Sequence, residues 1–99
     1  MIKMFLSLGF NKKTNNEVVD TINRAKETIS KYYPGEVLEF VHNYNYMGNN
    51  RIECLGEAIK KMSACDIVYF INNWCEHSGC IIEHTVCEYY KIPYTSITV

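Results

Sequence analysis

The sequence has no long hydrophobic segment: no apolar run in its 99 residues approaches the roughly 20 residues of a membrane-spanning helix. Residues 1–10 contain a short apolar run without a small-residue cleavage site, so we expect a strand there rather than a signal peptide. Positive charge is not in excess either, since 10 Lys and Arg face 11 Asp and Glu for a net charge of −1. We therefore expect neither a membrane nor a nucleic acid as partner.

Five cysteines occur without a secretory signal, and this odd number favours free thiols in a reducing cytosol, so we expect a cytoplasmic protein. The sequence lacks the usual structural-zinc pattern of two close ligand pairs separated by a longer loop. Cys80, His84 and Cys87 would nevertheless fall on adjacent turns of a helix, where they could hold zinc. Because cysteine is also a common small buried residue, we favour that alternative and expect neither a metal nor a cofactor.

Short apolar runs alternate with helical patterns along the chain. Strands are predicted at residues 2–8, 37–41, 67–71 and 94–99. The first helix should begin at a capping box, Thr14 to Glu17, and stop by Pro34 and Gly35. A second helix carries an apolar stripe from Leu55 to Met62, and a third runs from Gly79 to near Lys91. No repeat or linker interrupts the order β-α-β-α-β-α-β, which predicts one α/β domain over residues 1–99.

The alternating order also predicts the arrangement of the sheet. Strands joined through helices pair in parallel, with right-handed crossovers and helices on the faces. The two most continuously apolar strands, residues 2–8 and 66–71, should be the most buried. We therefore expect a mainly parallel sheet of about four strands with these two adjacent at its centre.

Glu83 is the main candidate functional residue. At helical spacing it shares a face with Gly79, Cys87 and Tyr90, and that face should pack against the sheet. Acids are almost never fully buried without a partner. The preceding segment, NNWCEHSG, follows a buried strand, and ligands bind beyond the carboxyl ends of parallel strands. Glu83 is thus either a catalytic or ligand-binding group, or an acid that pairs with a cation or a tyrosine hydroxyl to support the fold.

Aromatic residues in two loops have similar alternatives. Tyr44 and Tyr46 lie in a polar loop, residues 42–50, which either lines a pocket mouth or is an ordinary surface turn. Trp74 could stack on a base as a pocket wall, anchor a protein interface, or fold back over the core.

Several motifs together resemble a known family. The segment CDIVYF, a Trp-containing loop, SGCIIEH and a final IPY, over residues 55–94, resemble the nucleoside 2-deoxyribosyltransferase-like superfamily, in particular its small bacterial and phage members. The resemblance implies a small three-layer Rossmann-like or flavodoxin-like domain with a pocket for a nucleoside or nucleotide. It also implies the cytosol of a bacterium or of a phage-infected host.

The resemblance implies roles for individual residues. Glu83 matches the family nucleophile, which attacks the anomeric carbon of the sugar, and Asp66 matches the aspartate that meets the base. An alternative for Asp66 is a strand-start residue that caps neighbouring backbone. A cradle around the sugar or phosphate would be formed by Ser7, Gly9, Ser78 and Gly79. Family enzymes also carry a tyrosine near the end of the first strand that orients the nucleophile. Phe5 lies closest here, so Tyr44, Tyr46 or Tyr69 would have to supply that hydroxyl.

The resulting prediction is a protein that binds a nucleoside or nucleotide and cleaves or transfers an N-glycosidic bond. A non-catalytic binder that sequesters a nucleotide, for example a phage-encoded protein for a signalling molecule related to ADP-ribose, is the second interpretation. A structural or protein-binding module is the third. We also expect a homo-oligomer, because a domain this small buries only about two-thirds of its unfolded surface.

Overall fold

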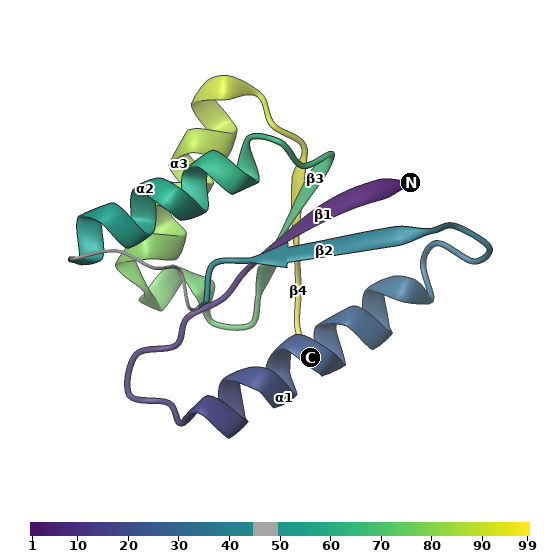
Figure 1. The fold of residues 1–99 in the computed structure, drawn as a ribbon, viewed down its shortest axis with the longest axis horizontal. Coiled ribbons are helices and arrows are strands. Elements are labelled where there is room, and N and C mark those ends of the chain that lie inside the picture. The colour runs from purple at the N-terminus through teal and green to yellow at the C-terminus, as the bar shows by residue number, and fades with distance from the viewer. Residues whose placement is uncertain (45–49) are drawn as a thin grey trace.

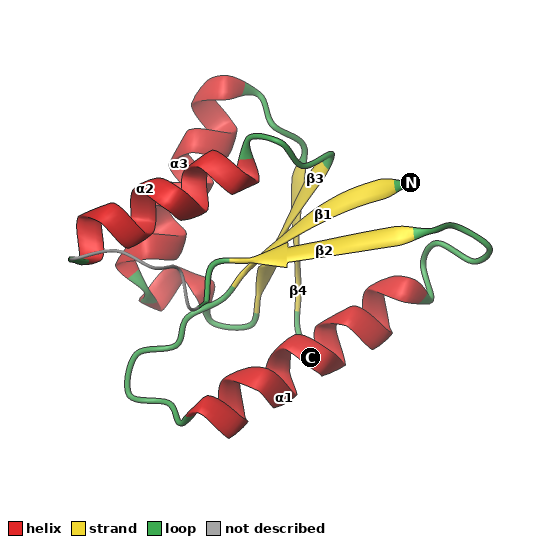
Figure 2. Cartoon of the chain, in the orientation of Figure 1, coloured by secondary structure: helices red, strands yellow, loops and turns green. Residues whose placement is uncertain are grey.

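The computed structural model describes residues 1–44 and 50–99. In chain order they form β1 (Ile2–Ser7), α1 (Asn15–Ser30), β2 (Leu38–His42), α2 (Arg51–Met62), β3 (Ile67–Ile71), a short 3₁₀ helix η1 (Trp74–Glu76), α3 (Ser78–Tyr90) and β4 (Tyr94–Ile97) (Figure 2). None of the helices in these ranges is both long and apolar enough to cross a membrane.

The strands form one parallel sheet in the order β2-β1-β3-β4. Helix α1 covers one face, and α2 and α3 cover the other (Figure 1). This is a small three-layer Rossmann-like α/β domain, which confirms the predicted fold class and the central pair β1 and β3. The chain first moves outward to β2 and then crosses back over β1 to β3. Ligands bind at the carboxyl edge of such sheets, at the point where the strand order reverses, so the site is expected beyond β1 and β3.

Successive residues of β1 feed opposite layers, as side chains of a strand must. Met4 and Leu6 belong to the core beneath α1, whereas Phe5 packs with Val68 and Phe70 in the core beneath α2 and α3. By the same alternation Ser7 faces the layer of α2 and α3. This places a buried hydroxyl at the carboxyl end of a central strand.

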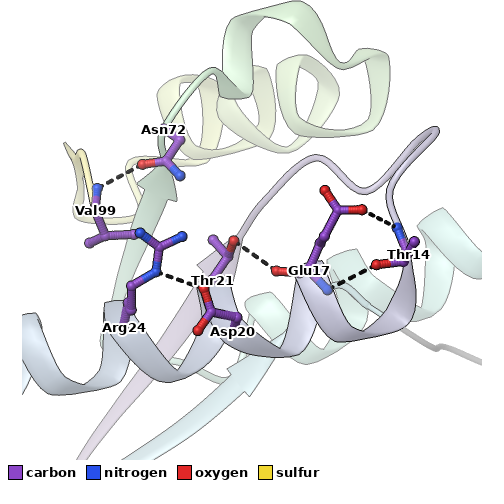
Figure 3. Close-up of polar contacts among 7 residues, drawn as sticks. All are labelled: Thr14, Glu17, Asp20, Thr21, Arg24, Asn72 and Val99. Carbon is purple, nitrogen blue, oxygen red and sulfur yellow. Dashed lines mark hydrogen bonds and ion pairs between the residues drawn. The ribbon is translucent and has the colours of Figure 1, made fainter.

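The predicted capping box of α1 is confirmed (Figure 3). The Glu17 N–H donates to Thr14 Oγ1 at 3.2 Å, and the Thr14 N–H donates to Glu17 Oε1 at 3.0 Å. At its other end α1 stops at Ser30, about one turn before Pro34. A turn follows in which Tyr32 N–H donates to the Ile29 carbonyl. The proline therefore lies in the loop after the helix rather than at its last residue.

Two predicted strand ends were too long, because side chains replace the sheet pairing there. Strand β4 ends at Ile97, and the Val99 N–H then donates to Asn72 Oδ1 at 2.7 Å (Figure 3). Strand β1 ends at Ser7, and the Leu8 N–H donates to Asn43 Oδ1 at 3.1 Å. Strand β2 is shifted by one residue from its predicted range, to Leu38–His42.

Candidate functional site

A cavity of about 610 Å³ lies beyond the carboxyl ends of β1 and β2, between the first turns of α2 and α3. Its volume is in the range of small-molecule sites. The residues after β1 and β2 form one side, and the starts of the two helices form the other. Its walls are formed by Leu8, Gly9, Phe10, Asn11, Asn43, Tyr44, Asn50, Arg51, Ile52, Cys54, Leu55, Ala58, His77, Ser78, Gly79, Cys80, Ile82 and Glu83.

Glu83 lies at the buried base of this cavity, with 1% of its surface exposed. The Ser7 hydroxyl donates to Glu83 Oε1 at 2.6 Å, and the Asn43 side-chain N–H approaches the same oxygen at 3.5 Å. Burial raises the pKa of Glu83 to about 7, although the Ser7 hydrogen bond acts in the opposite direction. In the described ranges no Lys, Arg or His forms an ion pair with Glu83. Glu83 is therefore an inward acid without a countercharge.

The two carboxylate oxygens of Glu83 have different surroundings. Both hydrogen bonds from described residues reach Oε1. Among these residues, no buried side-chain oxygen or nitrogen lacks a partner. No described residue donates to Oε2, and Glu83 is a residue of the cavity wall. Oε1 is thus held by Ser7 and Asn43, whereas Oε2 receives no hydrogen bond from the described residues.

Ser7 was predicted to line the ligand pocket, but it does not line the cavity. Its side chain is fully buried and is absent from the cavity wall, because the strand alternation turns it toward α3. Its hydroxyl contacts Glu83 instead. The hydroxyls of Tyr44 and Tyr69 are hydrogen-bonded to other side chains, so neither orients Glu83.

Asn43 has a role that the sequence did not reveal. Its side chain continues the pairing of β2 with β1 beyond the strand ends, since it accepts from the Leu8 N–H and donates to the Leu8 carbonyl at 3.0 Å. These two bonds fix the amide group, which then reaches Glu83. The available signal was its position directly after a strand that neighbours β1.

Asp66 is not brought to the site, and this expectation needs correction. It precedes β3, at the amino edge of the sheet, and its Oδ2 accepts from the Lys3 N–H at 2.8 Å. Ser7, which contacts Glu83, pairs with Phe70 in register. Phe70 is four residues beyond Asp66, or about 13 Å along the strand at ~3.3 Å per residue. The observed role of Asp66 is the capping of a neighbouring strand.

Trp74 is also outside the cavity wall. Its ring stacks on His84 at 4.5 Å between centroids and packs against Phe70 at 5.1 Å. Trp74 therefore folds back over the core beside α3, which is the third of the alternatives given for it above. Tyr46 lies outside the described residues, whereas Tyr44, Gly9, Ser78 and Gly79 line the cavity as predicted.

None of the five cysteines forms a disulfide bond. Burial raises the pKa of Cys80 and that of Cys87 to about 11 each, so both are neutral thiols near pH 7. Across residues 1–44 and 50–99, no three His, Cys, Asp or Glu side chains are grouped to hold a metal ion. Cys80 is thus a protonated part of the cavity wall.

The two glycines of the cavity wall differ in the space around them. A side chain at Gly9 would collide with the imidazole of His77, whereas one at Gly79 would meet nothing within 4 Å. We expect Gly9→Ala to destabilise the protein by about 1–3 kcal/mol, because the ring must leave its place. Gly79→Ala, the matched control, should be neutral or stabilising by up to about 1 kcal/mol, since alanine is the better helix former. Urea denaturation of the two variants measures this, and equal stabilities would contradict the close packing of His77 on Gly9.

The site therefore combines four segments that are distant in sequence: the ends of β1 and β2 and the first turns of α2 and α3. They line a cavity whose wall includes one buried acid, Glu83, that forms no ion pair with a described residue. No protein-family model matches the chain, and no curated protein does so either.

Proposed function

We propose that the protein binds a nucleoside or nucleotide in the cavity and cleaves or transfers its N-glycosidic bond, with Glu83 as the nucleophile. The observation that carries this proposal is the asymmetry of Glu83 in the cavity wall, with Oε1 held by Ser7 and no described donor at Oε2. The position of the cavity at the carboxyl edge of the parallel sheet supports it. So does the resemblance of SGCIIEH and CDIVYF to the nucleoside 2-deoxyribosyltransferase-like superfamily.

The proposed reaction has two steps. Oε2 of Glu83 forms a bond to the anomeric carbon while the carbon–nitrogen bond breaks, and the electron pair of that bond stays on the base nitrogen. The base takes up a proton from water or from His77, which lines the same cavity. A water oxygen then bonds to the anomeric carbon and loses a proton, and the Glu83 carboxylate is released. In a transfer reaction a second base replaces the water. A carboxylate suits both steps because it stabilises the oxocarbenium-like transition state.

A panel of nucleosides, 5′-nucleotides and ADP-ribose-type compounds tests this function. We expect at least one of them to release its free base, detected by chromatography. Because the nucleophile must be ionised and the pKa of Glu83 is raised to about 7, kcat/KM should rise about tenfold per pH unit below pH 7 and level off above it. A rate that falls above pH 7 would instead indicate a general acid, and no base release from any compound would contradict catalysis.

The second candidate function is capture of a nucleotide without turnover, as in a phage-encoded protein that sequesters a signalling nucleotide. The position of Asp66 favours it, because the acid expected beside the base lies at the opposite edge of the sheet. A binder would return the compound intact after denaturation of the complex. The same panel therefore separates the two functions.

We further propose that the protein acts in the cytosol as a homo-oligomer whose copies meet through the outer side of α3. There Ile81 is 44% exposed and Tyr89 is 81% exposed. Exposed apolar side chains that gather in one patch are typical of a protein–protein interface. Tyr90 at the end of α3 and Tyr94 at the start of β4 are also exposed, by 77% and 40%.

Sedimentation equilibrium should accordingly give at least twice the monomer mass at micromolar concentration. Tyr89→Glu should shift the protein to monomer, because a charge cannot be buried cheaply in such an interface. Val19→Glu is the matched control, since Val19 is an exposed apolar residue of α1 on the other face of the sheet. A monomeric parent protein, or equal effects of the two variants, would contradict this interface.

A further inference from the structure

The two hydrogen bonds that described residues make to the Glu83 side chain converge on one atom. Ser7 Oγ lies 2.6 Å from Oε1, a short distance typical of a hydroxyl that donates to a charged oxygen. The Asn43 amide approaches the same oxygen at 3.5 Å. Within the described ranges nothing donates to Oε2. The arrangement distinguishes two atoms that are chemically equivalent in a free glutamate.

The chemistry of the donors decides where a proton on Glu83 must lie. The Asn43 atom near Oε1 is the side-chain nitrogen, which can only donate, so Asn43 does not accept a proton from Oε1. The Ser7 hydroxyl donates its hydrogen to Oε1 at 2.6 Å, and its other hydrogen-bonding neighbour is the Cys80 side chain. A proton on Oε1 would face two donors. The proton of the neutral acid therefore belongs on Oε2.

We infer that Ser7 is the positioning residue of this site: it commits Oε1 to the protein and leaves Oε2 as the oxygen that carries the proton and meets the ligand. The statement about the ligand depends on the proposed function, whereas the statement about the proton concerns the ligand-free protein. Ser7 thus performs the task that a tyrosine of the first strand performs in the family that the sequence resembles. It does so two residues after Phe5, on the same face of β1.

The other groups around Glu83 leave Ser7 as the main local control of its ionisation. The titratable neighbours on α3 are Cys80 and Cys87, both neutral thiols near pH 7. On that face of β1, Ser7 contacts Glu83, Phe5 is uncharged, and Lys3 lies near the amino end of the strand, where it pairs with Glu39. The remaining titratable groups of the cavity wall come from α2 and from the loops, namely Arg51, Cys54, Tyr44 and His77. Burial raises the pKa of Glu83, and the Ser7 hydrogen bond lowers it. Loss of the hydroxyl should therefore raise the midpoint further.

Carbon-13 NMR of the glutamate carboxyl groups in the ligand-free protein tests this inference. The Glu83 signal is identified by its loss in Glu83→Gln. We expect a midpoint near pH 7 in the parent and an increase of about one pH unit, a tenfold change in proton affinity, in Ser7→Ala. Ser7→Cys, which keeps a weaker donor of similar shape, should lie between them. Thr21→Val is the matched control, because it removes another buried hydroxyl, bonded to the Glu17 carbonyl, on the far face of the sheet.

An unchanged or lower midpoint in Ser7→Ala overturns the inference. If that variant does not fold, an unchanged midpoint in Ser7→Cys overturns it equally. An increase in Thr21→Val of the same size would show a general effect of destabilisation and also overturn it. The titration does not depend on turnover, so the two proposals can fail separately. A raised midpoint in Ser7→Ala without base release in the parent supports the role of Ser7 and contradicts the proposed reaction. Base release in the parent with an unchanged midpoint in Ser7→Ala supports the reaction and contradicts the role of Ser7.

Discussion

Replacing Glu83 with glutamine should reduce base release by roughly 10³-fold or more, while the affinity for the same compound changes by less than about tenfold. Glutamine keeps the shape of the side chain and can still accept from the Ser7 hydroxyl, but it cannot form the glycosyl ester. The lost interaction belongs to the transition state, so kcat falls much more than binding. Among the described residues, Glu83 is the one Asp or Glu that lines the cavity. Its substitution should therefore reduce base release more than the substitution of any other described acid.

Single-turnover base release and equilibrium binding, measured on the same variant, separate the two quantities. Glu88→Gln is the matched control, since Glu88 lies on the same helix with a 54% exposed side chain and pairs with His84. It should leave both quantities unchanged. Full activity in Glu83→Gln would exclude Glu83 from the chemistry, and unchanged binding as well would exclude it from the site. A loss of binding alone would identify a protein that captures its ligand.

The stability of the folded protein should also depend on Glu83 and on pH. The pKa of Glu83 rises from 4.5, its ordinary value, to about 7 on burial. The folded state thus binds this proton more tightly than the unfolded state does. The contribution of Glu83 to the free energy of unfolding is therefore fully present below pH 4.5 and is lost as the pH rises through about 7. The difference between the two values corresponds to about 3 kcal/mol.

Urea denaturation of the parent and of Glu83→Gln at pH 4.5 and pH 8 measures this contribution. The free energy of unfolding of the parent should fall by about 3 kcal/mol more than that of the variant over this range. Other titrating groups, such as Glu17 and His42, are present in both proteins and cancel in the difference. A difference between parent and variant that does not change with pH would contradict the burial of an ionisable Glu83.

Local patterns were sufficient to predict most of the fold. The bounds of β3 and the capping box at Thr14 depend on residues within a few positions of each other, and both were predicted correctly. The strand ends were less accurate because their partners are remote. Leu8 is paired by Asn43 and Val99 by Asn72, and periodicity contains no information on such contacts.

The site was predictable in part for the same reason. Helical spacing indicated that Glu83 points inward, but it could not indicate which atom of β1 lies opposite. Ser7 was therefore assigned to the ligand, whereas it contacts the nucleophile candidate. Asp66 was assigned by resemblance alone. Its position before β3 already implied the amino edge of the sheet, away from the edge where ligands bind.

The contact between Ser7 and Glu83 also has a consequence for folding. It joins residues 76 positions apart, and the contact of Asn43 with Glu83 spans 40. Contacts of such long range form late, because the chain must first lose the entropy of closing a large loop. A ribosome-bound chain that ends before α3 can pair β1 with β2 but cannot bury Glu83. The site is therefore completed in the last stage of folding, and a ligand bound there stabilises the whole chain rather than one segment.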